Sequence, residues 1–221
     1  MIEVKNISKN YRVGPEAMAV VNNVSLTISN GEMLAIVGHS GSGKTTLLSL
    51  IGGLTRPDAG TIVIDGTDLW ALSDNRLAEF RNRKINFIYQ FASLIPTLTA
   101  LENVMLPTLF GHWQGDISRK AMDLLAAVGL AEKMKNYPSQ LSGGQQRRVA
   151  IARAFINDPA VVLADEPTGD LDEETEAEIF RFFTKLNREK KISFIIVTHS
   201  SELAGKTKRQ IRMNNGGLVG S

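Results

Sequence analysis

The sequence predicts an α/β fold in which helices cover both faces of a largely parallel β-sheet. Short apolar runs of strand length alternate along the chain with segments of helical spacing, which is typical of such sheets. Residues 99–157 show helical spacing without strand signals, and they predict an inserted helical subdomain. With 221 residues, 43% of them hydrophobic, the chain can bury the core of one domain, whose α/β part is formed by residues 1–98 and 158–221.

The first part of the chain predicts strands, a loop and a helix. Apolar alternation favours strands over residues 2–8 and 19–28, and Asn30-Gly31 marks a turn. Residues 33–37 are continuously apolar, as expected for a buried strand, and residues 44–51 favour a helix. Further elements of the same kind follow: a strand at 61–64, a helix from Asp74 to about Arg83, and a strand at 85–89.

The rest of the chain returns from helical to mixed patterning. Residues 121–128 carry apolar side chains at helical spacing within the predicted helical subdomain. Strand runs reappear at 161–164 and 193–197, and a charged helix from about Glu173 to Glu189 separates them. Residues 214–217 predict only a turn.

Composition and charge exclude several classes of function. Lys and Arg total 25 against 23 acidic residues, so net charge gives no general argument for binding nucleic acid or anionic lipid. The absence of cysteine excludes disulfides, thiolate metal sites and thiol nucleophiles. The N-terminus does not read as a signal peptide, and the apolar runs are far shorter than the ~20 residues of a membrane span. We therefore expect a soluble chain that reaches a membrane only through a partner.

A phosphate-binding loop follows the predicted strand at 33–37. Gly38-His39-Ser40-Gly41-Ser42-Gly43-Lys44-Thr45 fits G-x-x-x-x-G-K-[ST] between a strand and a helix. Backbone N–H groups of such a loop bind phosphate oxygens, Lys44 reaches the β- and γ-phosphates, and the Thr45 hydroxyl binds Mg²⁺. His39 occupies a free position of the pattern, and Thr46 follows the pattern directly. Both residues are expected to lie in the nucleotide-binding site. The alternative, a purely structural glycine-rich turn, is disfavoured by the strand–loop–helix context.

Two acidic residues end the predicted strand at 161–164. Asp165 is expected to hold Mg²⁺ through water, and the adjacent Glu166 to polarise the attacking water as a general base. A solvated strand end is the alternative, and the upstream phosphate loop argues against it.

A second glycine-containing turn lies in the helical segment. In Leu141-Ser142-Gly143-Gly144-Gln145, a serine hydroxyl and glycine N–H groups precede a helix, which repeats the chemistry of an anion-binding helix N-terminus. Ser142 is also expected to cap that helix, because cap and anion site use the same geometry. One nucleotide already has a cradle in residues 38–45, so the second cradle needs another explanation.

These three motifs, in this order, resemble the ABC ATPases, the motor subunits of ATP-binding-cassette transporters. The resemblance runs from about Ile2 to the region of Met213. It implies a P-loop NTPase core with a mostly parallel sheet, an N-terminal antiparallel β-subdomain and an inserted α-helical subdomain. It also implies binding of ATP and Mg²⁺, hydrolysis of ATP, and an ATP-dependent homodimer in which two chains enclose two ATP molecules head to tail. The cradle at residues 142–145 would then serve the nucleotide of the facing subunit.

The resemblance assigns roles to further residues. Tyr11 corresponds to the aromatic residue that stacks on adenine, and Gln90 to a Mg²⁺ ligand that senses the transmembrane partner. His199 corresponds to the switch histidine that contacts the γ-phosphate. The resemblance thus implies three catalytic residues, Glu166, His199 and Lys44. Asp172 lies in the loop that crosses between the two sites. Asp170 adds a charge at a position where the family commonly has a small or amide residue.

Residues 91–107 look like the lipoprotein-release and macrolide-export subfamily. This finer resemblance implies a transmembrane permease subunit as partner, a role in export or in extrusion of lipids or peptides, and a cytoplasmic location on the inner face of the cell membrane. Phe91 departs from the family, which often has a second amide there. The apolar residues between 91 and 98 predict the docking site of the partner. The alternative is that these residues seal the helical subdomain against the α/β core, and some of them are expected to do both.

Other functions of the same cassette remain open. An ABC ATPase that regulates a non-transporting membrane complex, of the cell-division or cell-envelope type, would look identical in sequence. Chromosome-type members need a long coiled coil between the two glycine motifs and ribosome-type members carry two cassettes, so we expect no nucleic-acid partner. A binding module without catalysis is disfavoured by intact Lys44, Asp165, Glu166 and His199.

Overall fold

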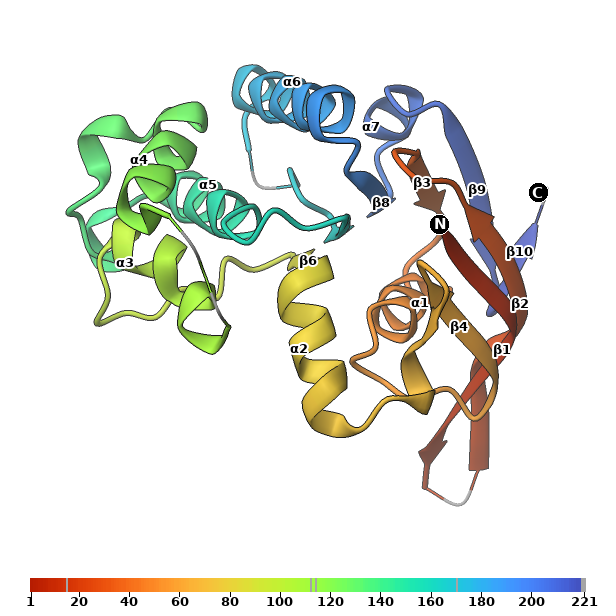
Figure 1. The fold of residues 1–221 in the computed structure, drawn as a ribbon. Helices are drawn as coiled ribbons and strands as arrows, with labels where there is room; N and C mark the ends of the chain where they lie inside the picture. Colours follow the sequence, from red (N-terminus) through yellow and green to blue (C-terminus); the bar gives the residue numbers. More distant parts are fainter. Residues whose placement is uncertain (15, 112, 114, 170, 220–221) are drawn as a thin grey trace.

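A computed structural model describes residues 1–14, 16–111, 113, 115–169 and 171–219, with the side chains of Val13, Glu16 and Ala17 left aside (Figure 1). Asp170, whose charge the sequence singles out, lies outside this part of the chain. Among the described residues, no helix is both long and apolar enough to cross a bilayer.

The central sheet has six strands in the order β10-β9-β3-β8-β7-β6. All neighbouring pairs in it are parallel except β9 and β10, which confirms the predicted largely parallel sheet. Because parallel strands end at the same edge, the loops that follow β3, β7 and β8 meet there. The strands of this sheet are β3 (Met33–Val37), β6 (Ile85–Ile88), β7 (Val161–Asp165), β8 (Ser193–Thr198), β9 (Arg209–Asn214) and β10 (Gly217–Val219).

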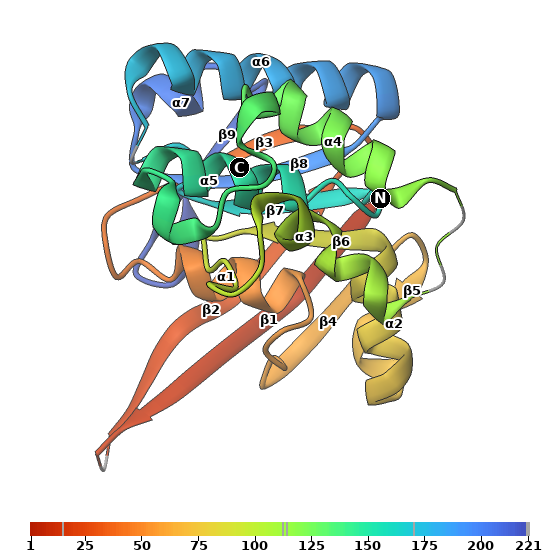
Figure 2. The same ribbon diagram turned by 90° about the vertical axis from the view of Figure 1, so that its left-hand side faces the viewer.

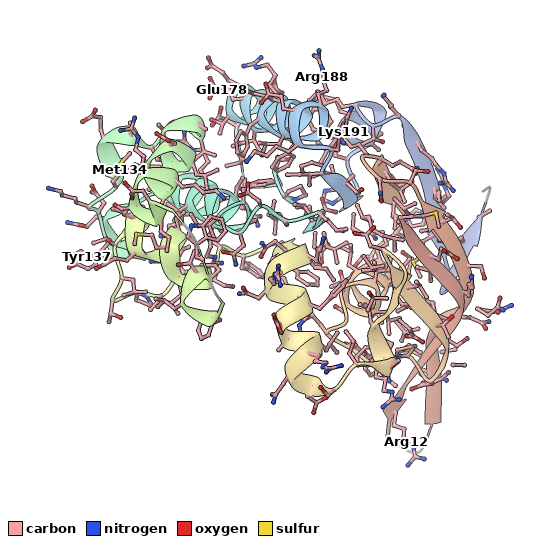
Figure 3. All side chains as sticks on the ribbon, viewed as in Figure 1. Arg12, Met134, Tyr137, Glu178, Arg188 and Lys191 are labelled. Atoms are coloured by element: carbon pink, nitrogen blue, oxygen red, sulfur yellow. The ribbon has the colours of Figure 1, made fainter. Side chains whose placement is uncertain are left out.

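A second sheet has four antiparallel strands in the order β2-β1-β4-β5, as expected for the N-terminal β-subdomain. Its strands are β1 (Ile2–Val13), β2 (Glu16–Ile28), β4 (Ala59–Ile64) and β5 (Thr67–Asp68). The predicted bounds 2–8 and 19–28 were too short, because β1 and β2 continue as an extended hairpin beyond the core (Figure 1). Side chains such as Arg12, at the end of that hairpin, face solvent and do not follow the apolar alternation (Figure 3).

Helices cover both faces of the central sheet, as predicted. In Figure 2, α6 and α7 lie on one side of the sheet, and α1 with β1 and β2 lies on the other. Along β8, Phe194 and Ile196 enter the core under α6, whereas Ile195 and Val197 enter the core against α1. The helices of this part are α1 (Lys44–Ile51), α2 (Asp74–Lys84), α6 (Glu173–Lys190) and α7 (Ser201–Gly205), with a 3-10 turn at Leu69–Ala71.

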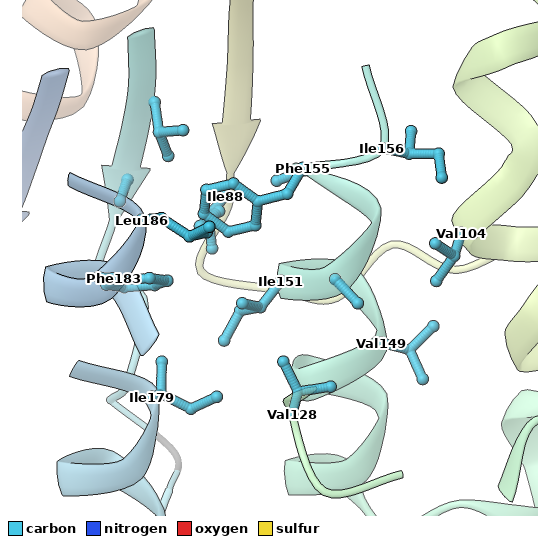
Figure 4. Close-up of a cluster of buried hydrophobic side chains, with 14 of the residues drawn as sticks. Ile88, Val104, Val128, Val149, Ile151, Phe155, Ile156, Ile179, Phe183 and Leu186 are labelled. Atoms are coloured by element: carbon cyan, nitrogen blue, oxygen red, sulfur yellow. The ribbon is translucent and has the colours of Figure 1, made fainter. Parts of the chain in front are cut away.

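Between residues 99 and 157 the described chain contains helices and no strand. They are α3 (Ala100–Met105), α4 (Ile117–Ala127) and α5 (Gly143–Arg153), with 3-10 segments at Leu106–Phe110, Ala131–Lys133 and Pro138–Gln140. Helix α5 packs between α3 and α6: Val149 lies on the side of Val104, while Ile151 lies on the side of Ile179 (Figure 4). One buried cluster therefore joins this helical subdomain to the α/β core.

The C-terminal segment differs from its prediction. Residues 214–217 are the turn of a hairpin between β9 and β10, and both strands went unrecognised. In β9, Ile211 and Met213 are buried while Gln210 and Arg212 are exposed, so the strand has the period-two alternation of a strand with one buried face. The run is short and polar, which hid the pattern. The strand predicted at 85–89 ends one residue earlier, at Ile88.

Candidate nucleotide-binding site

The phosphate loop connects β3 to α1 and folds around the Lys44 ammonium group. Lys44 Nζ donates hydrogen bonds to the carbonyl oxygens of Gly38, at 2.8 Å, and His39, at 2.9 Å. The Ser42 N–H donates to the His39 carbonyl at 3.2 Å. The lysine thus lies inside the loop, at the N-terminus of a helix, where it can reach a bound phosphate.

Two glycines of the loop have no room for a side chain. Gly43 has a φ of 100°, and a Cβ there would lie 2.3 Å from the carbonyl oxygen of Val20 in β2. A Cβ at Gly38 would lie 2.3 Å from the carbonyl oxygen of Met213 in β9. Strands of both sheets therefore touch the loop, and only glycine permits this close approach.

The turn after β9 braces the same loop. The Gly216 N–H donates to the Ser42 carbonyl at 3.1 Å, and the Asn22 N–H of β2 donates to the Gly216 carbonyl at 2.9 Å. Sequence reasoning treated residues 214–217 as merely a turn and missed this contact. Only the pairing of distant strands brings Gly216 to the loop.

Asp165 lies at the end of β7, beside the first turn of α1. Its Oδ2 accepts a hydrogen bond of 2.7 Å from Thr45 Oγ1. Burial raises the pKa of Asp165, as does the charge of Glu166, while the Thr45 hydrogen bond and the charges of Lys44 and Arg147 act in the opposite direction. A hydroxyl and a carboxylate held together at a phosphate loop are oxygen ligands of the kind that Mg²⁺ prefers.

Glu166 is held by groups at the end of β8. Its Oε1 accepts from the His199 N–H at 2.7 Å and lies 2.7 Å from His199 Nδ1, and its Oε2 accepts from Thr198 Oγ1 at 2.9 Å. The φ of Glu166 is 45°, in the left-handed region that is unfavourable for a residue with a side chain. Such strain often occurs at functional sites, and here it accompanies a carboxylate with a fixed orientation.

Ser142 is the N-cap of α5, as the sequence predicts. Its Oγ accepts from the Gln145 N–H at 3.3 Å, and the Gln145 Oε1 accepts from the Ser142 N–H at 3.0 Å. Ser142 and Gly143 are exposed, and a Cβ at Gly143 would meet no described atom within 4 Å. A Cβ at Gly144 would lie 3.3 Å from Leu171. Contacts within the described chain therefore explain a small residue at 144 but not at 143.

The structure brings some predicted site residues together and leaves others apart. The phosphate loop, Asp165, Glu166 and His199 meet at one edge of the central sheet. Gln90 follows β6, whose Ile88 pairs with Ala164, and it is exposed next to this edge. No hydrogen bond within the described residues joins Ser142 to the phosphate loop.

Tyr11 and Asp172 have defined places outside this cluster. Tyr11 is 40% exposed on β1 and pairs with Met18 of β2, two residues before the Val20 that touches the loop. Asp172 caps α6 by accepting from the Thr175 N–H at 2.9 Å, and this hydrogen bond is the main cause of its lowered pKa.

Asn103 is a polar residue that sequence reasoning missed. It is fully buried in α3, accepts from the Ile95 N–H at 2.8 Å, and donates to the carbonyls of Ile95, Leu98 and Thr99. An asparagine within an apolar helical run was the available signal. It fixes the loop that follows Gln90.

The residues present fit a nucleotide with Mg²⁺. Ser42 Oγ is buried in the phosphate loop without a hydrogen-bond partner in the described part of the protein, and a phosphate bound in the loop would supply one. Together with the Lys44 ammonium and the Thr45–Asp165 oxygens, the fold and site define a P-loop nucleotide-hydrolysing protein.

Comparison with known proteins assigns the chain within that class. Residues 21–169 match the ABC transporter family, and the chain belongs to it. It is 47% identical over 219 residues to the lipoprotein-releasing system ATP-binding protein LolD of Bordetella avium, covering 99% of this chain and 95% of the relative. It is 45% identical over 218 residues to LolD of Bordetella pertussis, covering 98% and 94%. The protein is therefore an ATPase of the ABC type, similar to the lipoprotein-release subfamily.

Solved structures show the same fold. The dimeric ATP-binding cassette MJ0796, in a post-hydrolysis state bound to ADP and Pi, superposes with a TM-score of 0.93 at 41% identity, covering 99% of this chain and 96% of that one. A second dimeric structure of the same cassette superposes equally well, at 42% identity.

Proposed function

We propose that this protein is the ATP-hydrolysing subunit of a membrane complex that extracts or extrudes lipid-anchored or peptide cargo. The names of its relatives, lipoprotein-releasing ATP-binding proteins, support that class of cargo. The chain would act at the cytoplasmic face of the cell membrane, bound to a separate transmembrane permease. The observation that carries the catalytic part is the Glu166 carboxylate, fixed by His199 and Thr198 next to the Thr45–Asp165 pair.

Each residue at this edge has a distinct task in ATP hydrolysis. Lys44 exchanges its bonds to the loop carbonyls for bonds to the β- and γ-phosphates, and His199 contacts the γ-phosphate. Glu166 accepts the proton of the attacking water, because its orientation is already set. Thr45, Asp165 and Gln90 would hold Mg²⁺, which neutralises charge that develops on the phosphate oxygens.

The second glycine motif serves the nucleotide of a facing copy of the chain. Ser142 and Gly143 are exposed at the start of α5, and no contact in the described chain requires glycine at 143. The dimeric structures of a cassette with the same fold support a paired arrangement. The two ATP sites would then each combine Lys44 of one chain with Ser142 of the other.

A complementation experiment tests this shared site. Lys44→Ala and Ser142→Arg should each abolish ATPase activity of the homodimer, since each removes a group from both sites. In a mixed dimer one site loses both groups and the other keeps both, so mixing the inactive variants should restore activity. Thr99→Arg is a matched control, because Thr99 caps α3 with the same capping box as Ser142 caps α5. It should remain active, and a mixture that forms heterodimers without recovering activity would overturn the proposal.

The permease is proposed to dock beside α2 and the segment after Gln90. Phe91, Leu109 and Phe110 are each more than 70% exposed. A group of large apolar side chains with so much exposed surface is typical of a site that binds another protein. A cavity of about 480 Å³, lined in part by Leu54, Phe87 and Phe110, provides a groove for an apolar helix of the permease. Within the predicted patch of residues 91–98, Leu94 is half-buried and packs against the buried core, so we propose that it supports the docking surface from below while Phe91 and Ile95 are exposed on it.

A further inference from the structure

The hairpin of β1 and β2 carries Tyr11 on an arm that extends beyond the core (Figure 1). Tyr11 pairs with Met18 across the hairpin, and the two residues are 40% and 54% exposed. A two-stranded ribbon that packs against little else is only marginally stable. Contacts outside the ribbon must therefore fix the place of Tyr11 relative to the phosphate loop.

On the β2 side, a β-bulge joins the arm to the phosphate loop. The register of the two strands shifts between Lys9 and Asn10, where Val20 is the extra residue of β2. The Val20 carbonyl oxygen lies against Gly43, where a Cβ would come within 2.3 Å of it. The arm thus begins at a point that touches the loop.

On the β1 side, the carboxylate of Asp58 holds the strand just before Tyr11. Its Oδ1 accepts from Lys9 Nζ at 2.8 Å, and its Oδ2 accepts from the Asn10 N–H at 2.7 Å. The Asp58 N–H donates in turn to the Ser8 carbonyl at 2.8 Å. The hydrogen bond from Lys9 lowers the pKa of Asp58, so the group carries its charge at neutral pH. Asp58 belongs to the connection that follows α1, the helix that begins at the phosphate loop.

Lys9 connects this carboxylate to the Tyr11 ring. Its Nζ lies over the ring, 5.8 Å from the centroid, and also donates to the Arg56 carbonyl at 2.9 Å. The Lys9 side chain is only 17% exposed, so it is held among these partners. A cation attracted to the ring covers one face and leaves the opposite face for a stacking ligand.

We propose that Lys9 and Asp58 are positioning residues for the nucleobase: Asp58 fixes the Lys9 ammonium over one face of the Tyr11 ring, so that the ring presents its other face to adenine. This inference rests on the proposed function, in which the chain binds ATP, and on the expected stacking of Tyr11 on adenine. Because Asp58 follows α1 and Val20 touches the phosphate loop, the base end and the phosphate end of the site are held in one unit.

Two ligands separate the base end of the site from the phosphate end. ADP and inorganic pyrophosphate, each with Mg²⁺, share a diphosphate, but only ADP carries a base, and neither is hydrolysed at the γ-position. Lys9→Met should raise the Kd for ADP about threefold to fivefold, as for loss of one cation–π contact, and leave the Kd for pyrophosphate unchanged. Asp58→Asn should act in the same direction. Lys5→Met is the matched control, since Lys5 lies on the same strand and forms an ion pair of 2.7 Å with Glu3; it should keep both affinities.

A double-mutant cycle tests whether the lysine acts through the ring. Tyr11→Ala should raise the Kd for ADP about fivefold or more, and adding Lys9→Met to it should raise the Kd no further. Lys9→Arg, which keeps the charge, should bind ADP almost as well as the wild type. Additive losses in the double variant, equal losses of ADP and pyrophosphate affinity, or unchanged ADP affinity in either Lys9→Met or Asp58→Asn overturn the proposal.

The outcomes separate this inference from the proposed function. If the wild type binds neither ADP nor ATP, the proposed function fails. If it binds both but Tyr11→Ala leaves ADP affinity unchanged, the base does not stack on Tyr11, and the positioning role fails while ATP hydrolysis stands. Thermal unfolding identifies a misfolded variant, and the comparison of Lys9→Arg with Lys9→Met keeps the test decisive if Asp58→Asn does not fold.

Discussion

Glu166→Gln isolates proton transfer from every other contribution to catalysis. The carboxylate accepts hydrogen bonds from the His199 N–H and from Thr198 Oγ1, and a glutamine has nearly the same shape. Its amide cannot take a proton from water. We therefore expect ATP binding to persist while hydrolysis stops, so that ATP holds the variant as a stable dimer.

The expected changes in kcat and in melting temperature follow from the contacts of Glu166. Loss of a general base typically costs about 10²–10⁴ in rate, so kcat should fall at least about 100-fold. The glutamine oxygen can keep the bond from His199, but its NH₂ group then faces Thr198 Oγ1, which already accepts from the Ser200 N–H at 3.0 Å. Thr198 is fully buried, so its hydroxyl proton loses an acceptor at a cost of about 1 kcal/mol. The melting temperature should therefore fall by only about 2–4 °C.

Phosphate release at saturating ATP and Mg²⁺, with size-exclusion chromatography and thermal unfolding, measures these effects. Glu176→Gln is a matched control, because the Glu176 side chain is 18% exposed against 14% for Glu166 and also accepts from a threonine hydroxyl, at 2.8 Å. It should keep nearly full activity. The reasoning is refuted if Glu166→Gln turns over ATP within tenfold of the wild type, stays monomeric with ATP, or is matched in inactivity by the control.

Other changes have equally direct consequences. Asp165→Asn should abolish Mg²⁺-dependent turnover and stabilise the nucleotide-free chain at neutral pH. Because burial raises the pKa of Asp165, the contribution of this group to stability is lost as pH rises from 3.8 through the raised value. Denaturant titrations should therefore show that the difference in unfolding free energy between the variant and the wild type vanishes near pH 3.8. Asn103→Ala should cost about 2–4 kcal/mol of unfolding free energy, since the loop after Gln90 loses its buried hydrogen bonds. A cysteine introduced in place of Phe110, which is exposed, should crosslink to the permease in membranes. A cysteine in place of Lys185 should not, because α6 lies away from α2 (Figure 1). Equal crosslinking of the permease by both cysteines would argue against the docking site.

Local pattern predicted those elements whose sequence is bounded by clear signals. The predicted bounds 33–37 and 44–51 coincide with β3 and α1, because a continuous apolar run ends at a glycine loop and a helix follows. The β1–β2 hairpin, α7 and the β9–β10 hairpin were mispredicted or missed. The strands β1 and β9 also pair with β4 and β3, which are distant in sequence, and their own sequences do not reveal these partners. Helix α7 spans only Ser201–Gly205, which is too short for an apolar periodicity to show.

In the candidate site, too, short motifs could be predicted from the sequence, whereas contacts with distant strands could not. Its reactive groups, in residues 38–45 and at Asp165 and Glu166, belong to short patterns whose chemistry fixes the spacing. The groups that hold them come from elsewhere: the Val20 and Met213 carbonyls meet the phosphate loop from other strands. A main-chain carbonyl has no signature in the sequence, so such contacts appear only once the strands are paired.

The origin of these supports also separates the two parts of the proposed reaction. Glu166 and its partner His199 are fixed by the ends of adjacent parallel strands, which share one rigid ladder. Ser142 and the residues around Gln90 are instead fixed to α5. Movement of the helical subdomain can therefore complete or open the nucleotide site without disturbing the general base. On the proposed function, the permease would control when ATP is enclosed, while Glu166 and His199 keep their positions in every state.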